Sequence, residues 1–300
     1  MTLLDHPLLA SRYFLPRPGA LEAAFFVVAA DGQSRLGCFR SAPYDGARAL
    51  TVLHFHGNAE IVPDYVPSMA HVMNDLGVNV VFAEYRGYGA STGAPSINAM
   101  LDDSESIFQA LRVSASRVVA FGRSLGSIFA LEVARRHPGI AGLILESAIA
   151  EPLDPAIVRV SAEDLGASKE ELAAAVAERV DQRAKISGYA GPLLVMHTTA
   201  DMLIPVTHAQ RLFEWAGARP AQKKLVLFEQ GDHGTIYAAN REDYMVELGA
   251  FLDRVRRDHR TPRRERATER SSDSPRRDHA TERSSDPTKA PSRKTSQGEW

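Results

Sequence analysis

Residues 117–126 read RVVAFGRSLG, and this stretch decides the fold that the sequence predicts. Its first five residues form an apolar, β-branched run typical of a buried strand. The motif Gly122-Arg123-Ser124-Leu125-Gly126 follows and leads into a helical pattern. A G-x-S-x-G turn between strand and helix presents the serine hydroxyl at the strand's end, and its glycines leave room for neighbouring backbone. The sequence therefore predicts Ser124 as a nucleophile on an elbow shaped by Gly122 and Gly126. The alternative is an ordinary tight turn with a surface serine.

Apolar runs of about strand length recur on both sides of this motif. There are eight of them: Ala24–Ala29, Leu36–Phe39, Leu50–Phe55, Val78–Ala83, Arg117–Phe121, Gly142–Leu145, Pro192–Met196 and Lys224–Phe228. From the third run onward, helical patterns separate them: Val62–Leu76, Ile97–Leu111, Ser127–Arg136, Val206–Ala216 and Arg241–Val255. This alternation predicts the α/β class, with a mostly parallel eight-stranded sheet and helices on both faces. The first two runs have no helix between them and predict an antiparallel hairpin.

One stretch breaks the alternation between strands and helices. Residues Glu151–Ala190 lie between the sixth and seventh strands and are too long for a single crossover helix. They contain helical patterns near Pro155–Val160 and Lys169–Arg183. We interpret residues 150–190 as a small cap insert after strand 6, over the carboxyl edge of the sheet. Open parallel sheets bind their ligands at that edge.

The chain changes character at residue 258. Residues 258–300 contain only four members of the hydrophobic set and repeat the sequence ATERSSD. Such a segment buries too little apolar surface to offset the entropy of ordering. We therefore predict one α/β domain over residues 1–257, followed by a disordered charged tail. Its eleven basic and eight acidic residues are interspersed, so a solvated tail is a simpler interpretation than a tether to RNA or an anionic surface.

Composition narrows the function classes. The 300 residues include 35 Lys and Arg against 37 Asp and Glu, a net charge of −2, which argues against a dedicated nucleic-acid binder. Cys38 is the single cysteine, which rules out an intrachain disulfide and a cysteine-rich zinc cluster. No apolar run reaches the roughly 18 residues of a membrane span, and the first residues lack a secretory signal pattern. These observations predict a cytoplasmic protein without stable membrane insertion.

A serine hydroxyl needs a base to take its proton. Of the ten histidines, His54 and His197 fall within strand patterns and are interpreted as satisfied core residues. His233 differs, because it lies in EQGDHG, a loop between the last strand and the last helix. The flanking glycines let this loop fold back over the sheet edge. His233 is therefore the predicted general base, with a solvated loop histidine as the alternative.

The imidazole in turn needs a carboxylate to fix its tautomer. Asp201 follows the seventh strand and completes the chain order Ser124, Asp201, His233, which is the order for this type of sheet. Glu146, at the end of the sixth strand, and Asp232, beside the histidine, are the competing acids. We prefer Asp201, because adjacent residues rarely aim their side chains at each other. A helix N-cap is its alternative role.

A tetrahedral intermediate requires backbone N–H donors aimed at its developing charge. Leu125, directly after the serine, supplies one. The second is expected from the loop after the third strand, which reads His56-Gly57-Asn58. There Gly57 lets the backbone approach the site, and the Asn58 N–H is the predicted donor. His56 is assigned a structural role through local hydrogen bonds, and an ordinary strand-to-helix turn is the alternative for the whole loop.

Together these residues resemble the α/β-hydrolase superfamily over most of residues 20–256. The segments His56-Gly57-Asn58 and Glu84–Gly93 (EYRGYGASTG), with Asp201 and the following Ile204-Pro205, are similar to the serine-aminopeptidase-like group. That group also holds depalmitoylase-like hydrolases. The resemblance implies hydrolysis of an ester, a thioester or, less often, an amide, with no metal and no organic cofactor.

The leading hypothesis is a serine hydrolase that cleaves a small-molecule carboxylic ester or thioester through an acyl-enzyme. Its rivals are a peptidase or amidase on the same residues and a catalytically silent binding protein, since a fold does not entail an activity. No sequence feature favours a cofactor-free haloperoxidase. In the Glu84–Gly93 loop, the glycines are interpreted as shaping the backbone, and substrate contact by Tyr85 or Tyr88 is the alternative.

Overall fold

The computed structural model describes residues 2–22, 24–41, 49–158 and 160–260. The predicted tail lies outside the described residues from residue 261 onward. Residues 258–260 belong to the last helix, and the domain boundary at residue 257 stays a prediction. In the described part of the chain, no helix combines the length and the apolarity that crossing a bilayer would require.

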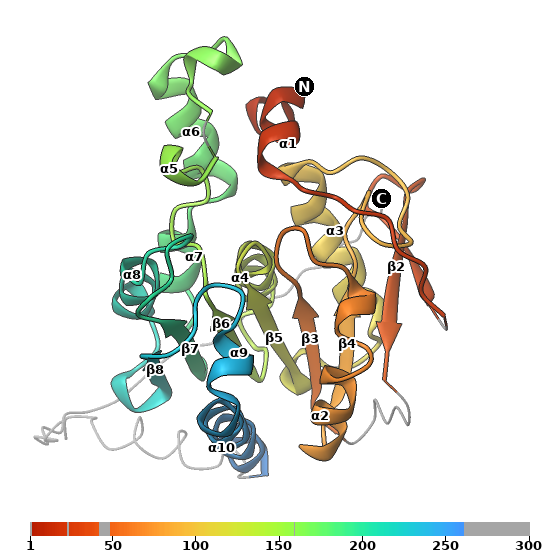
Figure 1. Cartoon of the computed structure of the whole chain (residues 1–300), viewed down its shortest axis with the longest axis vertical. Helices are drawn as coiled ribbons and strands as arrows, with labels where there is room; N and C mark the ends of the chain where they lie inside the picture. Colours follow the sequence, from red (N-terminus) through yellow and green to blue (C-terminus); the bar gives the residue numbers. More distant parts are fainter. Residues whose placement is uncertain (1, 23, 42–48, 159, 261–300) are drawn as a thin grey trace, which may run out of the picture. The chain divides into compact units, whose positions relative to one another are not determined.

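The described residues form one sheet of eight strands in the order β1-β2-β4-β3-β5-β6-β7-β8. The strands are β1 (Phe25–Val28), β2 (Arg35–Arg40), β3 (Thr51–Phe55), β4 (Asn79–Ala83), β5 (Val118–Arg123), β6 (Gly142–Glu146), β7 (Leu193–Thr198) and β8 (Lys223–Phe228). β1 pairs with β2, and β2 with β4, in antiparallel fashion, while the remaining neighbours are parallel. Each strand overlaps the run that predicts it (Figure 1), so the predicted α/β fold class is confirmed.

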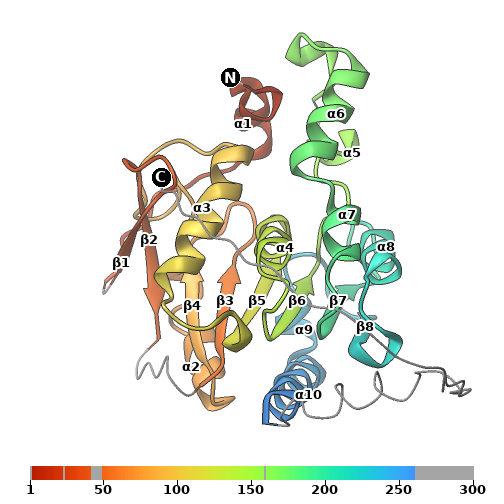
Figure 2. The same ribbon diagram turned by 180° about the vertical axis from the view of Figure 1, so that it is seen from behind.

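Helices cover both faces of this sheet. The described α-helices are α1 (Pro7–Tyr13), α2 (Met69–Asp75), α3 (Ile97–Ala110), α4 (Gly126–Arg136), α5 (Pro155–Val158), α6 (Lys169–Arg179), α7 (Gln182–Ser187), α8 (Thr207–Trp215), α9 (Ile236–Ala239) and α10 (Arg241–Arg260). Short 3-10 helices are η1 (Leu3–Asp5), η2 (Val62–Asp64), η3 (Ala115–Arg117), η4 (Glu163–Leu165) and η5 (Pro220–Gln222). α3, α4 and α8 pack on one face, and α2 and α10 on the other (Figures 1 and 2). Successive strand residues point to opposite faces, so Leu53 joins the first core and Val52 the second.

Two of the predicted helices are wrong in extent. The pattern over Val62–Leu76 predicts one helix, but only η2 and α2 form there. Pro67 lies between them, and a proline lacks the N–H that a helix interior needs. The pattern over Lys169–Arg183 likewise divides into α6 and α7. There the Asp181 side chain accepts the Ala184 N–H at 2.8 Å and caps a new helix.

Helix α1 lies outside the sequence prediction, because two turns are too short to show a clear period. It begins where the His6 side chain accepts the Leu8 N–H, and it is anchored by the buried side chains of Leu9 and Tyr13. α1 contacts α5 and η4 of the insert, and both segments stand beyond the carboxyl ends of the strands (Figures 1 and 2). The N-terminal segment and the insert therefore border the same edge of the sheet.

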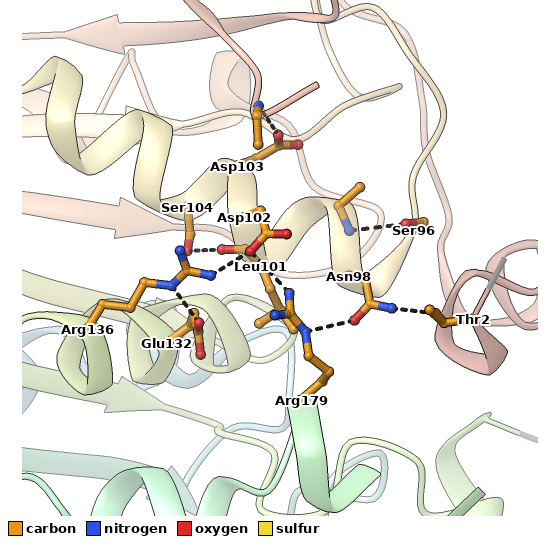
Figure 3. A network of polar contacts seen from close by, with 12 residues as sticks. Thr2, Ser96, Asn98, Leu101, Asp102, Asp103, Ser104, Glu132, Arg136 and Arg179 are labelled. Carbon is orange, nitrogen blue, oxygen red and sulfur yellow. Dashed lines mark hydrogen bonds and ion pairs between the residues drawn. The ribbon is translucent and has the colours of Figure 1, made fainter. Parts of the chain in front are cut away.

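A polar network fastens the insert to the helices beneath it (Figure 3). Asp102 of α3 accepts hydrogen bonds from Arg136 of α4 at 2.5 Å and from Arg179 of α6 at 3.1 Å. Arg179 also donates to the side-chain oxygen of Asn98 at 3.0 Å. Glu132 of α4 accepts from Arg136 at 2.6 Å. The carboxyl end of α6 is thereby held against two helices of the main domain.

Candidate active site

The predicted site residues lie on loops at the carboxyl edge of the sheet. The strand order reverses at β3, because β4 lies on one side of it and β5 on the other. Ligands of open α/β sheets bind at such a switch point. The loop after β3 carries Asn58, and the loops after β5, β7 and β8 carry Ser124, Asp201 and His233.

Ser124 lies in a strained turn between β5 and α4. Its φ of 50° is left-handed, a conformation that costs a non-glycine residue on the order of 1–3 kcal/mol. A Cβ on Gly122 would lie 2.5 Å from the Ser127 Cα, and one on Gly126 would lie 2.1 Å from the Phe55 carbonyl oxygen. Both glycines are therefore required by the close approach of α4 to the sheet.

The turn brings the Ser124 hydroxyl to His233, and His233 to Asp201. The distance from Ser124 Oγ to His233 Nε2 is 2.9 Å, and that from His233 Nδ1 to Asp201 Oδ2 is 2.7 Å. The Asp201 side chain is completely buried, whereas that of His233 is 16% exposed. A continuous line of hydrogen bonds thus runs from a buried carboxylate to a serine at the edge of the sheet.

Asp201 is surrounded by hydrogen-bond donors. Its Oδ1 accepts the N–H groups of Leu203 and Ile204 at 2.9 and 2.8 Å, and its Oδ2 lies 3.3 Å from the His197 Nε2. Burial raises the pKa of this carboxyl, but the hydrogen bonds from His197, His233 and Ile204 outweigh it and hold the pKa well below 3.8. Asp201 is therefore an anion at physiological pH. His197, interpreted from the sequence as a core residue, is one of its supports.

The two competing acids are engaged elsewhere. The Glu146 Oε1 accepts a hydrogen bond from the Arg123 Nη1 at 2.9 Å. Asp232 accepts backbone N–H groups of its own turn. Within the described residues, the carboxylate that contacts the His233 ring is that of Asp201.

His54, predicted as a satisfied core histidine, is buried but not fully satisfied. Its ring packs against the rings of Tyr65, Phe82 and Phe121, and its Nδ1 has no hydrogen-bond partner in the described part of the chain. Burial lowers the His54 pKa to about 3, so the ring is neutral at physiological pH.

Among the described residues, no group of three or more His, Cys, Asp or Glu could hold a metal ion.

The loop after β3 is tied down by its side chains. His56 contacts the Gly57 carbonyl oxygen through Nδ1 at 2.8 Å and Glu84 through Nε2 at 2.7 Å. Burial lowers the pKa of His56, but the Glu84 carboxylate, the Gly57 carbonyl oxygen and Glu60 together raise it, so the net shift is upward. The backbone N–H groups of Asn58 and Leu125 make no hydrogen bond within the described residues. Both are thus available to an atom of a ligand.

Two buried tyrosines brace this loop from below. The Tyr85 hydroxyl donates to the His56 carbonyl oxygen at 2.6 Å, and the Tyr88 hydroxyl donates to the Asn58 Oδ1 at 2.7 Å. The Leu15 N–H donates to the same Asn58 oxygen at 2.9 Å, so the N-terminal segment also holds the loop. Both tyrosines are at most 4% exposed, and their hydroxyls are engaged in hydrogen bonds to the loop.

Comparisons with known proteins show the family of this chain. A family model described as serine aminopeptidase, S33, matches residues 46–169. The uncharacterised protein YfhR of Escherichia coli K12 is 30% identical over 251 residues, which cover 79% of this chain and 82% of that protein. Human alpha/beta hydrolase domain-containing protein 17C is 30% identical over 201 residues, or 65% of this chain and 56% of that protein. This chain is an α/β-hydrolase.

It belongs to the serine-aminopeptidase-like group of that superfamily. Among solved structures, an esterase from Pyrococcus furiosus superposes on this α/β-hydrolase with a TM-score of 0.63. The match covers 80% of this chain and 98% of the esterase, at 17% identity, and therefore shows the shared fold. Family and fold together support a hydrolase.

The sequence analysis of this α/β-hydrolase did not predict a cluster of polar contacts around Arg123, which we call the hub. Arg123, a variable position of the G-x-S-x-G motif, donates to Glu60 and to Glu146 at 2.9 Å each, and to the His233 carbonyl oxygen at 3.1 Å. Glu60 in turn accepts the Gly57 N–H at 2.6 Å. One guanidinium thus joins the loop after β3, the end of β6 and the loop that carries the histidine.

Arg123 and Glu60 favour each other's charged forms. Burial lowers the pKa of the Arg123 guanidinium, but the neighbouring Glu146 and Glu60 raise it, and the net shift is upward. Burial raises the pKa of Glu60, but Arg123 and the hydrogen bonds from Tyr65 and Gly57 together lower it, and the net shift is downward. Two signals in the sequence could have revealed this cluster. Arg123 is a charged residue inside the G-x-S-x-G motif, and Glu60 follows His56 by four positions.

Proposed function

We propose that this α/β-hydrolase cleaves a small-molecule carboxylic ester or thioester through an acyl-enzyme. Ser124 is the nucleophile, His233 the base and Asp201 the orienting acid. The observation that carries this proposal is the pair of hydrogen bonds, 2.9 Å from Ser124 to His233 and 2.7 Å from His233 to Asp201. The known relatives support hydrolysis in general, and the choice of bond is our own inference.

In the acylation step, the Ser124 Oγ attacks the substrate carbonyl carbon while the His233 Nε2 takes the hydroxyl proton. The negative charge moves to the carbonyl oxygen, where the N–H groups of Asn58 and Leu125 stabilise it. The intermediate then collapses, the bond to the alkoxide or thiolate breaks, and His233 gives its proton to the leaving group. Asp201 holds the Nδ1 proton throughout and stabilises the imidazolium.

Deacylation repeats these steps with water. His233 takes a proton from a water molecule that attacks the acyl carbon, and the same pair of N–H groups stabilises the second oxyanion. Collapse breaks the bond between the acyl carbon and the Ser124 Oγ. His233 returns its proton to that oxygen, so the enzyme is regenerated and the carboxylic acid leaves.

The Ser124→Ala variant tests this mechanism directly. We expect hydrolysis of p-nitrophenyl butyrate to fall by roughly 10³-fold or more, because no other group takes the acyl chain. Labelling by a fluorophosphonate probe should disappear, while the circular dichroism spectrum stays that of the wild type. Unchanged turnover in this variant would overturn the proposal. An unlabelled wild-type protein would instead favour a silent binding protein.

Amide hydrolysis is the second candidate, because the matching family model is that of a serine aminopeptidase. A panel of esters, thioesters and p-nitroanilides with one common acyl group separates the possibilities. We expect kcat/KM to be highest for the esters or thioesters. A preference for the anilides, especially those with a free amino group, would assign the enzyme to the amidases.

A further inference from the structure

The Asn58 side chain is held at both of its polar atoms, largely by the N-terminal segment. Its Oδ1 accepts the Leu15 N–H at 2.9 Å and the Tyr88 hydroxyl at 2.7 Å. Its Nδ2 donates to the Tyr13 carbonyl oxygen at 2.5 Å. The amide of Asn58 is therefore fixed by backbone groups that lie 43 and 45 positions earlier in the chain.

These backbone groups belong to residues 13–19, which we call the strap. At its start, Tyr13 is buried with 5% exposure. Near its end, the Gly89 N–H donates to the Arg17 carbonyl oxygen at 2.9 Å, and the Gly19 N–H donates to the Gly89 carbonyl oxygen at 3.1 Å. The strap therefore crosses the loops after β3 and β4 as a segment fixed at both ends, which can be followed in red after α1 (Figure 1).

The loop after β3 needs such a hold because its backbone is strained. Ala59, directly after Asn58, has a left-handed φ of 62°, which persists in a non-glycine residue only where the surroundings enforce it. The Ala59 N–H contacts the Asn58 Oδ1 at 3.1 Å, so the turn is joined to the same amide. The Asn58 N–H makes no hydrogen bond within the described residues. Its direction therefore depends on this turn and on the contacts of the Asn58 side chain.

We propose that the strap completes the oxyanion hole: through the Asn58 side chain, Tyr13 and Leu15 aim the Asn58 N–H at the developing charge. The inference rests on the proposed function, because it requires that an oxyanion forms beside Ser124. Tyr13 and Leu15 are positioning residues, since they act through Asn58. A misdirected N–H weakens a hydrogen bond that gains its strength in the transition state, so the loss falls on kcat and not on KM.

A trifluoromethyl ketone separates a misdirected donor from a loss of folded protein. Propyl trifluoromethyl ketone carries the same acyl chain as p-nitrophenyl butyrate. The Ser124 Oγ bonds to its carbonyl carbon, the His233 Nε2 takes the hydroxyl proton, and the ketone oxygen becomes the oxyanion without any group leaving. Its inhibition constant Ki therefore measures the oxyanion hole. A smaller fraction of folded protein lowers the apparent kcat but leaves this Ki unchanged.

The Asn58→Ala variant is the first test, because it keeps the backbone N–H and removes the amide that the strap holds. We expect kcat for p-nitrophenyl butyrate to fall by at least about tenfold at nearly constant KM. The Ki for the ketone should rise by the same factor. Asn74→Ala, in the last turn of α2, is the matched control and should keep the wild-type kcat and Ki. An unchanged Ki in Asn58→Ala, or a loss confined to KM, overturns the proposal.

The Leu15→Pro variant decides if Asn58→Ala does not fold. Proline removes the N–H that Asn58 accepts and leaves the sequence of the loop after β3 unaltered. The preceding Phe14 has φ −98° and ψ 139°, the extended conformation that a residue before proline favours. We expect kcat and Ki to change together, as in Asn58→Ala. Leu15→Ala retains the N–H and should lose far less. A wild-type Ki in Leu15→Pro contradicts the role of the strap.

Failure of this inference is distinguishable from failure of the proposed hydrolysis. A wild-type protein that neither hydrolyses p-nitrophenyl butyrate nor binds the ketone refutes the hydrolysis, and the oxyanion hole with it. An active wild type whose Asn58→Ala and Leu15→Pro variants bind the ketone equally tightly refutes the strap alone.

Discussion

Ser124 shows how much a single residue depends on its immediate neighbours. Its left-handed φ of 50° is tolerated because Gly122 and Gly126 let α4 approach the sheet and because its N–H donates to the Glu146 carbonyl oxygen at 2.9 Å. Asp201 depends on distant residues instead, since His233 reaches it from 32 positions away. The acid is held ionised by its donors, not by exposure to solvent.

Replacing Asp201 with asparagine should therefore impair catalysis while leaving the fold intact. Asp201→Asn removes the charge that stabilises the imidazolium and fixes the histidine tautomer, so we expect kcat for p-nitrophenyl butyrate to fall by roughly 10³–10⁴-fold. Asp232→Asn is the matched control, because Asp232 adjoins His233 but, among the residues that the structure describes, its carboxylate bonds only its own turn. Equal losses in the two variants would contradict the role given to Asp201.

At the scale of elements, the loops at the carboxyl edge are joined to one another and not only to their strands. Arg123 connects the loop after β3, through Glu60, to the loop after β8, through the His233 carbonyl oxygen. The N-terminal segment adds a further link, because the Leu15 N–H donates to Asn58. The N–H group of Asn58, proposed as an oxyanion donor, and His233, the proposed base, are therefore positioned by shared contacts.

The Arg123→Met variant tests this coupling. We expect kcat to fall by about 10–100-fold with little change in KM, because the loops shift and the contacts with the substrate's ground state persist. Arg123→Lys should restore part of the loss, since its ammonium can still meet one carboxylate. Assays are made below the melting temperature of each variant, as Glu60 and Glu146 lose their partner. A rise in KM at constant kcat would show that Arg123 acts on substrate binding instead.

The attachment of the insert depends on pH through Glu132 of α4. Burial raises the pKa of this carboxyl, but the hydrogen bond from Arg135, the charge of Lys185 and the hydrogen bond from Arg136 outweigh it and lower the pKa from 4.5 to about 2. A carboxyl with a depressed pKa in the folded state stabilises the fold above its unfolded pKa. That contribution is lost as the pH falls from about 4.5 through 2.

Thermal unfolding between pH 7 and pH 2.5 should reveal this loss. The wild-type melting temperature is expected to fall more steeply below about pH 4.5 than that of Glu132→Gln, which cannot titrate. Glu214→Gln, at an exposed position of α8, serves as the control and should follow the wild type. Parallel curves for Glu132→Gln and the wild type would show that the ion pairs of Glu132 do not contribute.

At the scale of the whole molecule, the sheet order decides which loops meet. β3 and β5 are neighbours, and the later strands follow in sequence order. The loops that carry Asn58, Ser124, Asp201 and His233 therefore meet at one edge of the sheet. The insert and the N-terminal segment, which lie far apart in the sequence, border the same edge (Figures 1 and 2). All of these residues lie before residue 261.

A chain truncated after Arg260 should therefore retain full activity. We expect its kcat/KM for p-nitrophenyl butyrate and its melting temperature to match those of the full chain, since the deleted sequence has almost no apolar residues to bury. RNA retention at moderate salt is compared between the two proteins as a second readout. A loss of esterase activity on truncation would refute this expectation, and a loss of RNA binding alone would assign the tail a separate role.

The amino-acid sequence by itself determined the eight strands, the mostly parallel sheet and the serine elbow. These features depend on signals within a window of some ten residues: apolar runs such as Val78–Ala83, and glycines two positions on either side of Ser124. Two predicted helices are interrupted, one near Pro67 and one near Asp181. In both cases the residue that interrupts the helix lies within the same short window of sequence. Short helices such as α1 fall below the length at which a period can be recognised.

Only the tertiary structure decided which carboxylate meets His233, which donors surround Asp201, and how Arg123 joins the loops. Three acids were compatible with the sequence, and they differ in where long-range strand pairing places them. Contacts between residues tens of positions apart depend on the whole fold, because the same side chain can bond any partner that the backbone brings within 3 Å.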